Sequence, residues 1–256
     1  MQTVREIEKA LYQLSPKDGA MPGDNVGHLV GDPEREVTHV LVALDITEAV
    51  ADEAIAKGCD LIVAHHPVLN SNWSKVQSVR FDTRQGRILM KLIANGISAI
   101  CMHTNLDVSA GGVNDRLAKR LGLRSVETME NGLIRIGTLS QPMELRTFAG
   151  FVKKALGSNG VRYSDAGKTV SRVAVGGGSC GDYESEVLAA GCDTFVTADL
   201  KYHQFLDARD INLVDAGHFP TEDPVCEVLI EYLTAQFPEL SAEKSASHRE
   251  VIQYYV

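Results

Sequence analysis

Residues 46–67, ITEAVADEAIAKGCDLIVAHHP, contain the pattern that decides the fold. Residues 46–59 are amphipathic and predict a helix, and Gly58 is the expected C-cap because glycine readily adopts the left-handed conformation there. The apolar run within residues 60–67 predicts a buried strand that ends in two histidines and a proline. A helix followed directly by a buried strand is typical of an α/β protein.

The same two kinds of segment alternate along the whole chain. Buried strands are predicted at 36–45, 60–67, 97–107, 171–178, 193–199 and 211–218. Helices are predicted at 4–14, 46–59, 84–96, 114–123, 144–156, 182–192, 201–210 and 224–237. This alternation predicts an α/β fold with mainly parallel sheets flanked by helices.

An internal repeat divides the chain into two related halves. When residues 41–66 are aligned with 174–199, seven of the 26 positions are identical, and AKGCD faces AAGCD. We therefore expect two duplicated α/β halves, residues 1–128 and 129–256. Ligands in open parallel sheets bind at the carboxyl ends of the strands, so a shared site is expected there, between the halves.

Composition and charge exclude several classes of function. The 256 residues carry a net charge of −9, with a pI of about 5.4, which argues against general nucleic-acid binding. No apolar run is long enough to span a membrane, and the first residues show no charged n-region followed by an apolar h-region, as a secretory signal would require. The five cysteines form no CxxC pair, which indicates reduced thiols and a cytoplasmic protein.

Polar side chains gather where the predicted strands end. Five of the eight histidines lie at or just beyond these ends, and acidic residues accompany them. The candidate site residues are His65, His66, His103, Asp107, His203, His218 and Glu222. Because parallel strands end at the same edge of a sheet, these side chains are expected to lie together.

Each of these fragments also has a plainer interpretation. His65 and His66 would serve as a pair of hydrogen-bonding histidines, Asp107 as a helix cap, and Glu222 as a complement to a helix N-terminus. Taken together, three imidazoles and two carboxylates form the ligand set of a dinuclear hydrolytic site. Past the end of a strand, two adjacent histidines can reach one ion or two neighbouring ones.

Two glycine-rich stretches leave alternatives open. The backbone amides of residues 176–178 (GGG) are placed either to cradle an anion or to form a simple tight turn. Residues 24–27 (DNVG) suggest only that Asp24 and Asn25 organise turns.

Four motifs in the order HHP, HTNLD, DLKYH and GHFPTE resemble the dinuclear metal-centre family of GTP cyclohydrolase 1 type 2 homologues, also called NGG-interacting-factor-three-like proteins. DNVG fits the N-terminal motif of that family. The resemblance implies a duplicated α/β fold and a toroidal homohexamer with its metal sites facing an inner cavity. It also implies metal ligands, carried over motif by motif, at His65, His66, Asp107, His218 and Glu222.

The predicted function is that of a metal-dependent hydrolase. Two divalent ions (zinc, iron, manganese or nickel) would activate water against a nucleotide-like or phosphorylated small molecule. His103 and His203 are the candidates for proton transfer. The alternative is a non-enzymatic metal-binding protein that delivers or senses metal, or that serves as a scaffold.

Overall fold

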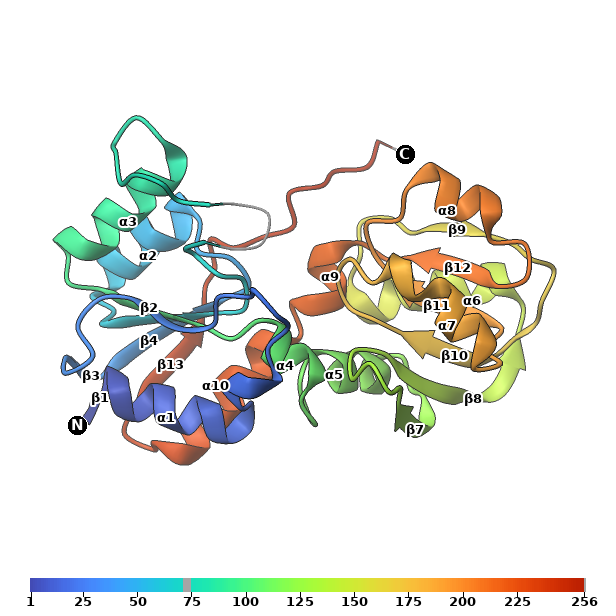
Figure 1. The fold of residues 1–256 in the computed structure, drawn as a ribbon, viewed down its shortest axis with the longest axis horizontal. Coiled ribbons are helices and arrows are strands. Elements are labelled where there is room, and N and C mark those ends of the chain that lie inside the picture. The colour runs from blue at the N-terminus through green and yellow to red at the C-terminus, as the bar shows by residue number, and fades with distance from the viewer. Residues whose placement is uncertain (71–74, 256) are drawn as a thin grey trace. The chain divides into compact units, whose positions relative to one another are not determined.

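A computed structural model of the chain describes residues 1–70 and 75–255. It divides into two compact units (Figure 1). Unit 1 comprises Met1–Gly112 and Val225–Arg249, and unit 2 comprises Val113–Pro224 and Glu250–Val256. The expected division at residues 128 and 129 differs from this one in two ways: residues 113–128 belong to unit 2, and residues 225–249, which include the last long helix and strand, belong to unit 1. The expected α/β class is confirmed in both units.

Unit 1 is built on a five-stranded sheet in the order β13-β4-β5-β6-β2. The first four strands are parallel, and β2 is antiparallel to β6. The strands are β2 (Gly27–Val30), β4 (His39–Ala43), β5 (Leu61–Ala64), β6 (Ser98–Cys101) and β13 (Ser241–Lys244), and a separate antiparallel pair joins β1 (Gln2–Thr3) to β3 (Glu36–Val37). The register pairs Ala64 with Cys101, so β5 and β6 end side by side.

Helices cover both faces of this sheet (Figure 1). They are α1 (Val4–Leu14), α2 (Glu48–Lys57), α3 (Arg84–Ala94), the short α4 (Thr104–Val108) and α10 (Val225–Gln236), with a 3₁₀ turn η1 (Lys17–Gly19). The apolar sides of α2 and α3 pack on alternate residues of the strands, including Leu41 and Ile62. On the opposite face α1 lies next to α10, where the Tyr232 hydroxyl donates to the Ala10 carbonyl at 2.8 Å.

Unit 2 is built on a six-stranded sheet in the order β7-β8-β10-β11-β12-β9. The three strands β10, β11 and β12 are parallel, and the outer strands are antiparallel to their neighbours. The strands are β7 (Arg124–Thr128), β8 (Arg135–Met143), β9 (Arg162–Ser164), β10 (Val170–Val175), β11 (Thr194–Thr197) and β12 (Asn212–Asp215).

The helices of unit 2 also lie on both faces of its sheet (Figure 1). They are α5 (Val113–Arg120), α6 (Leu145–Leu156), α7 (Glu184–Ala189), α8 (Tyr202–Asp207) and α9 (His218–Glu222), with a 3₁₀ turn η2 (Gly181–Tyr183). Apolar residues of α5 and α6, among them Leu117 and Phe148, pack on Val173 and Val196 of the strands. No helix in the described parts of the chain is both long and apolar enough to cross a membrane.

The repeated GCD sequence has the same backbone conformation and equivalent hydrogen bonds in both units. Its glycine is left-handed in each, with φ of 65° at Gly58 and 78° at Gly191. The carboxylate of Asp60 accepts the backbone N–H of residues 38 and 39 at 2.9 and 3.2 Å. Asp193 accepts those of residues 171 and 172 at 3.0 and 2.7 Å. In both units a helix is thus ended and the next strand tied to its neighbour by equivalent contacts.

Candidate metal centre

His65 and His66 follow directly after β5, and their backbones still belong to the sheet. The amide of His65 donates to Ala43 O at 3.2 Å, and that of His66 donates to Leu44 O at 2.9 Å. Both side chains are buried, and their ring centroids lie 5.0 Å apart. The two rings therefore stay together at the carboxyl edge of the sheet.

His103 brings a third imidazole to the same edge from the end of β6. Its ring centroid lies 5.2 Å from that of His65 and 5.5 Å from that of His66. Each of the three rings offers a nitrogen within 4.8 Å of the other two. Unit 1 therefore contains a cluster of three imidazoles with the spacing of metal ligands.

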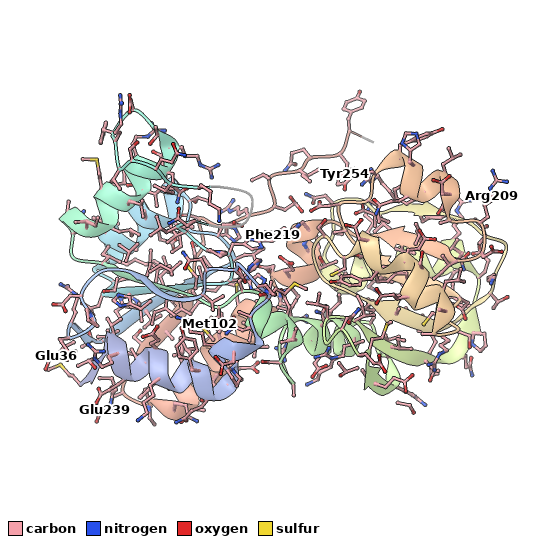
Figure 2. All side chains as sticks on the ribbon, viewed as in Figure 1. Glu36, Met102, Arg209, Phe219, Glu239 and Tyr254 are labelled. Carbon is pink, nitrogen blue, oxygen red and sulfur yellow. The ribbon has the colours of Figure 1, made fainter. Side chains whose placement is uncertain are left out.

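The hydrogen bonds of these rings fix the position of the ring protons. His65 Nδ1 lies 2.7 Å from the carbonyl oxygen of Met102, a residue labelled in Figure 2. His66 Nδ1 lies 2.9 Å from Asp45 Oδ1, and His103 Nδ1 lies 2.8 Å from Asp24 Oδ2. These oxygens accept hydrogen bonds, so each Nδ1 donates, and in the neutral form of each ring the lone pair is on Nε2. A histidine held in this way at one nitrogen is oriented to bind metal with the other.

The two carboxylates in these contacts are held in the ionised form. Burial alone would raise the pKa of Asp24, but hydrogen bonds from His103 and Thr104 outweigh it and hold that pKa well below its usual range. Asp45 behaves similarly: burial opposes ionisation, but His248 and His66 hold its pKa low. Asp24 and Asp45 are therefore anionic acceptors that orient imidazoles.

Asp107 adds a carboxylate to the cluster in unit 1. It lies on α4, where its backbone N–H donates to His103 O at 3.1 Å. Its Oδ1 faces His65 Nε2 at 3.5 Å. The lone pair of a neutral imidazole and a carboxylate oxygen repel each other, so this approach favours a positive charge at the pair, either a proton on Nε2 or a metal ion. Imidazole nitrogens with a carboxylate oxygen are a donor set that suits divalent transition metals, so these residues fit such an ion.

His218 and Glu222 form a second cluster, in unit 2, on the short helix α9. The two residues lie one helical turn apart, with His218 Nε2 2.9 Å from Glu222 Oε2. His218 Nδ1 lies 2.6 Å from Asp199 Oδ2. Burial opposes protonation of the imidazole, but Glu222 and Asp199 outweigh it and raise the pKa of His218 to about 11. Two carboxylates against one imidazole thus favour a positive charge in this cluster as well.

The glycine turn after β10 supports the second cluster by being small. A Cβ at Gly178, where φ is 63°, would lie 2.0 Å from Glu222 Oε1 and 3.2 Å from His218 Cε1. The amides of the turn already have acceptors: Gly177 donates to Asn114 Oδ1 at 2.7 Å, and Gly178 donates to Thr221 Oγ1 at 3.0 Å. Of the two interpretations of residues 176–178, the tight turn is therefore correct, and these two amides do not form an anion cradle.

The structure also shows where the candidate for proton transfer in unit 2 lies. His203 is exposed on α8, with its ring centroid 5.3 Å from that of Tyr202. Among the described residues it makes no hydrogen bond to His218 or Glu222. His103, in contrast, belongs to the imidazole cluster of unit 1.

Three acidic residues that orient the histidines were not predicted in that role. Asp45 ends a predicted strand, and polar residues at strand ends were the criterion for choosing the histidines, so the same criterion would have found Asp45. Asp199 follows β11 and adopts a left-handed φ of 55°, which is uncommon for a residue other than glycine. Asp24 meets His103 from 79 positions earlier in the chain, and the turn residues around it gave no sign of this contact.

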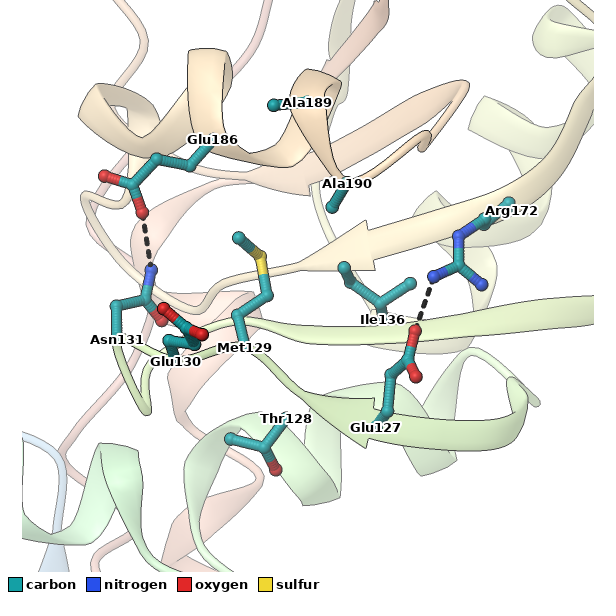
Figure 3. Close-up of a pocket in the computed structure, with 10 residues that line it drawn as sticks. All are labelled: Glu127, Thr128, Met129, Glu130, Asn131, Ile136, Arg172, Glu186, Ala189 and Ala190. Atoms are coloured by element: carbon teal, nitrogen blue, oxygen red, sulfur yellow. Dashed lines mark hydrogen bonds and ion pairs between the residues drawn. The ribbon is translucent and has the colours of Figure 1, made fainter.

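A separate hollow in unit 2, of about 500 Å³, lies under α7 beside β7 and β8 (Figure 3). Arg172 and Glu127 form an ion pair at one end of it, and Asn131 Nδ2 donates to Glu186 Oε2 at 3.4 Å at the other. None of the predicted site residues lines it.

The fold and these clusters define a class: an α/β protein with imidazole and carboxylate groups, arranged as candidate metal ligands, where its strands end. A family model described as Duf34/NIF3 (NGG1p interacting factor 3) matches residues 2–250. The chain belongs to this family.

The similarity to individual relatives extends over most of this chain and most of theirs. The chain is 37% identical over 243 residues to a Streptomyces coelicolor protein named GTP cyclohydrolase 1 type 2 homolog, covering 89% of this chain and 84% of that one. A Clostridium acetobutylicum protein of the same name is 36% identical, with coverage of 90% and 89%. The crystal structure of a Staphylococcus aureus hypothetical protein matches with a TM-score of 0.91 and 30% identity, covering 99% of both chains.

Proposed function

We propose that the chain binds two divalent metal ions, with His65, His66 and Asp107 of unit 1 and His218 and Glu222 of unit 2 as ligands. The observation that carries this proposal is the imidazole cluster of unit 1, in which every Nδ1 donates to an oxygen. The contact between His65 Nε2 and Asp107 Oδ1 supports it, as does the second cluster on α9.

We further propose that the bound metal serves hydrolysis of a nucleotide-like or phosphorylated small molecule, in line with the name of the relatives. Divalent ions lower the pKa of water and polarise a scissile bond. Asp24 accepts the hydrogen bond of His103 Nδ1, which leaves Nε2 as the ring atom for proton transfer. Asp45 and Asp199 orient His66 and His218.

Two broader expectations remain proposals. A cytoplasmic location follows from the reduced cysteines, and a toroidal homohexamer follows from the family resemblance. Light scattering on the purified chain tests the hexamer, and a mass near that of one chain would contradict it.

Metal content measured by elemental analysis tests the metal-binding proposal. The wild-type chain, reconstituted and freed of excess metal, is expected to hold about two ions per chain. His66→Ala and Glu222→Ala should each lose at least one. His39→Gln is the control because His39 contacts Glu243 rather than any proposed ligand. A wild-type chain that binds no transition metal would refute the proposal.

Activity is a separate question. The metal-loaded chain is screened against nucleotides and phosphoesters, and hydrolysis that is lost in His66→Ala is expected. Uniform inactivity, together with transfer of metal to a partner apoprotein, would instead support the non-enzymatic alternative.

A further inference from the structure

A cavity of about 250 Å³ opens beside His66 in unit 1. Asp45 and His66 line one part of it, and Asn70, Arg84 and Gln85 contribute its other polar side chains. A ligand in this cavity would lie against the ring of a proposed metal ligand. The volume is below the roughly 300–1,000 Å³ of pockets that enclose a whole drug-sized ligand, so it suits one end of a substrate.

Arg84 differs from the other basic residues of α3. Arg87 pairs with Glu48 at 2.7 Å, and Lys91 pairs with Asp52 at 2.5 Å. Arg84 is exposed at the start of the helix and makes no ion pair or hydrogen bond within the described residues. Its guanidinium therefore adds to the lining of the cavity a positive charge that no ion pair among the described residues neutralises, although the same charge also acts on Glu48.

The neighbouring polar groups leave room for an anion. Asn70, at a left-handed φ of 54°, accepts the Val76 amide through Oδ1 at 2.8 Å, which fixes its side-chain amide and leaves Nδ2 as a donor. Gln85 donates to the Val68 carbonyl. The negative charge of Asp45 is shared between two imidazoles, His66 at 2.9 Å and His248 at 3.3 Å.

We infer that this cavity binds the phosphate group of the substrate, with the Arg84 guanidinium and the Asn70 amide as donors. The inference rests on the proposed function, because it names the end of the substrate that the site holds next to His66. Phosphate suits the lining better than carboxylate because it offers several donors three terminal oxygens, which share about two negative charges. The planar guanidinium can bind two of these oxygens at once.

Binding of three small probes tests the inference: glycerol 3-phosphate, glycerate and glycerol. Titrations use the full chain, both with its metal and after chelation, so that direct metal–phosphate binding is separated from binding by Arg84. Glycerol 3-phosphate should bind best. Arg84→Gln should weaken it by at least about tenfold in both states, the range expected for losing a charged hydrogen bond. Asn70→Asp, which keeps the acceptor for Val76 but replaces the donor with a negative charge, should also weaken it.

Arg80→Gln is the matched control because Arg80 lies nearby on the same segment, pairs with Asp82 and does not line the cavity. It should change binding by less than about twofold, near the limit of such a comparison. Equal binding by Arg84→Gln and the wild-type chain, or equal loss in Arg80→Gln, would overturn the inference. Equal binding of glycerate would overturn the assignment to phosphate. A wild-type chain that takes up no metal on reconstitution but still binds glycerol 3-phosphate through Arg84 would refute the proposed function alone.

Discussion

Gly178 lies directly against the Glu222 carboxylate, so Gly178→Ala perturbs the second cluster without replacing a proposed ligand. The new methyl carbon would lie 2.0 Å from Glu222 Oε1, far inside contact distance. Gly178 also has a φ of 63°, which alanine adopts only with strain. We expect Glu222 to be displaced and the cluster to lose part of its affinity for metal.

Two costs add in this variant. The left-handed conformation costs an alanine about 1–2 kcal/mol, and forcing a methyl group into an occupied space costs about 1–3 kcal/mol. The expected loss in the free energy of unfolding is therefore about 2–5 kcal/mol. Gly191→Ala is the matched control, since Gly191 has a φ of 78° and a Cβ added there would meet no atom within 4 Å. Gly191→Ala should have only the cost of the left-handed conformation, a loss of about 1–2 kcal/mol in the free energy of unfolding.

Urea unfolding of both variants measures these costs, with chelator present so that bound metal adds nothing to the difference. Metal content after reconstitution is the second readout, and Gly191→Ala should match the wild-type chain. If both variants lose the same stability and both retain full metal content, Gly178 is not a support for Glu222, and the reasoning is refuted.

Three further predictions concern other contacts. Asp45→Asn should lower metal affinity by about 10–100-fold because it alters the hydrogen bond that orients His66. Competition with a chelating dye measures this affinity, and an unchanged value would contradict the prediction. Burial opposes ionisation of Glu53, but hydrogen bonds from Lys57 and from residues 245–247 outweigh it and lower the pKa of Glu53 below 4.5. The ionised side chain therefore adds to the free energy of unfolding above pH 4.5, and this contribution is lost as the pH falls below that value. Glu53→Gln should therefore cost about 1–2 kcal/mol at pH 6 and less at pH 3 in urea unfolding, and a cost that does not change with pH would count against this. Asp60→Ala and Asp193→Ala should each cost about 1–3 kcal/mol with metal content unchanged, and widely different costs would argue that the repeated contacts are not equivalent.

The repeat was predictable because the same residues recur in the same order in both halves of the sequence. Gly58 and Gly191 end helices in the same left-handed conformation, and the aspartate two positions later binds backbone next to it in the sheet. The helix end depends on a short-range pattern, which the sequence displays directly, whereas the aspartate contacts, 22 and 21 positions back along the chain, depend on the pairing of neighbouring strands. The α/β class and most helix and strand positions followed from the same patterns.

The division into units was less predictable because it depends on long-range packing. The final helix, α10, reads like any other amphipathic helix, and its pattern does not say which sheet it covers. In the structure β13 pairs with β4, about 200 positions earlier in the chain, and this pairing returns α10 to unit 1.

The candidate site was predicted in its histidines but not in the groups that orient them. His65, His66 and His103 were found because each follows a buried strand. Asp24 was not, because its contact with His103 joins a loop to a strand end through tertiary structure alone. The role of Gly178 likewise depends on how closely Glu222 approaches it, which no local pattern reveals.

Anomalous diffraction from crystals of the reconstituted chain, collected on both sides of the absorption edge of the added metal, tests most directly whether His65, His66, Asp107, His218 and Glu222 hold two ions. We predict two anomalous peaks per chain, each bonded to imidazole nitrogen and carboxylate oxygen from this set. A single peak, or peaks bound only by other side chains, would contradict the dinuclear centre.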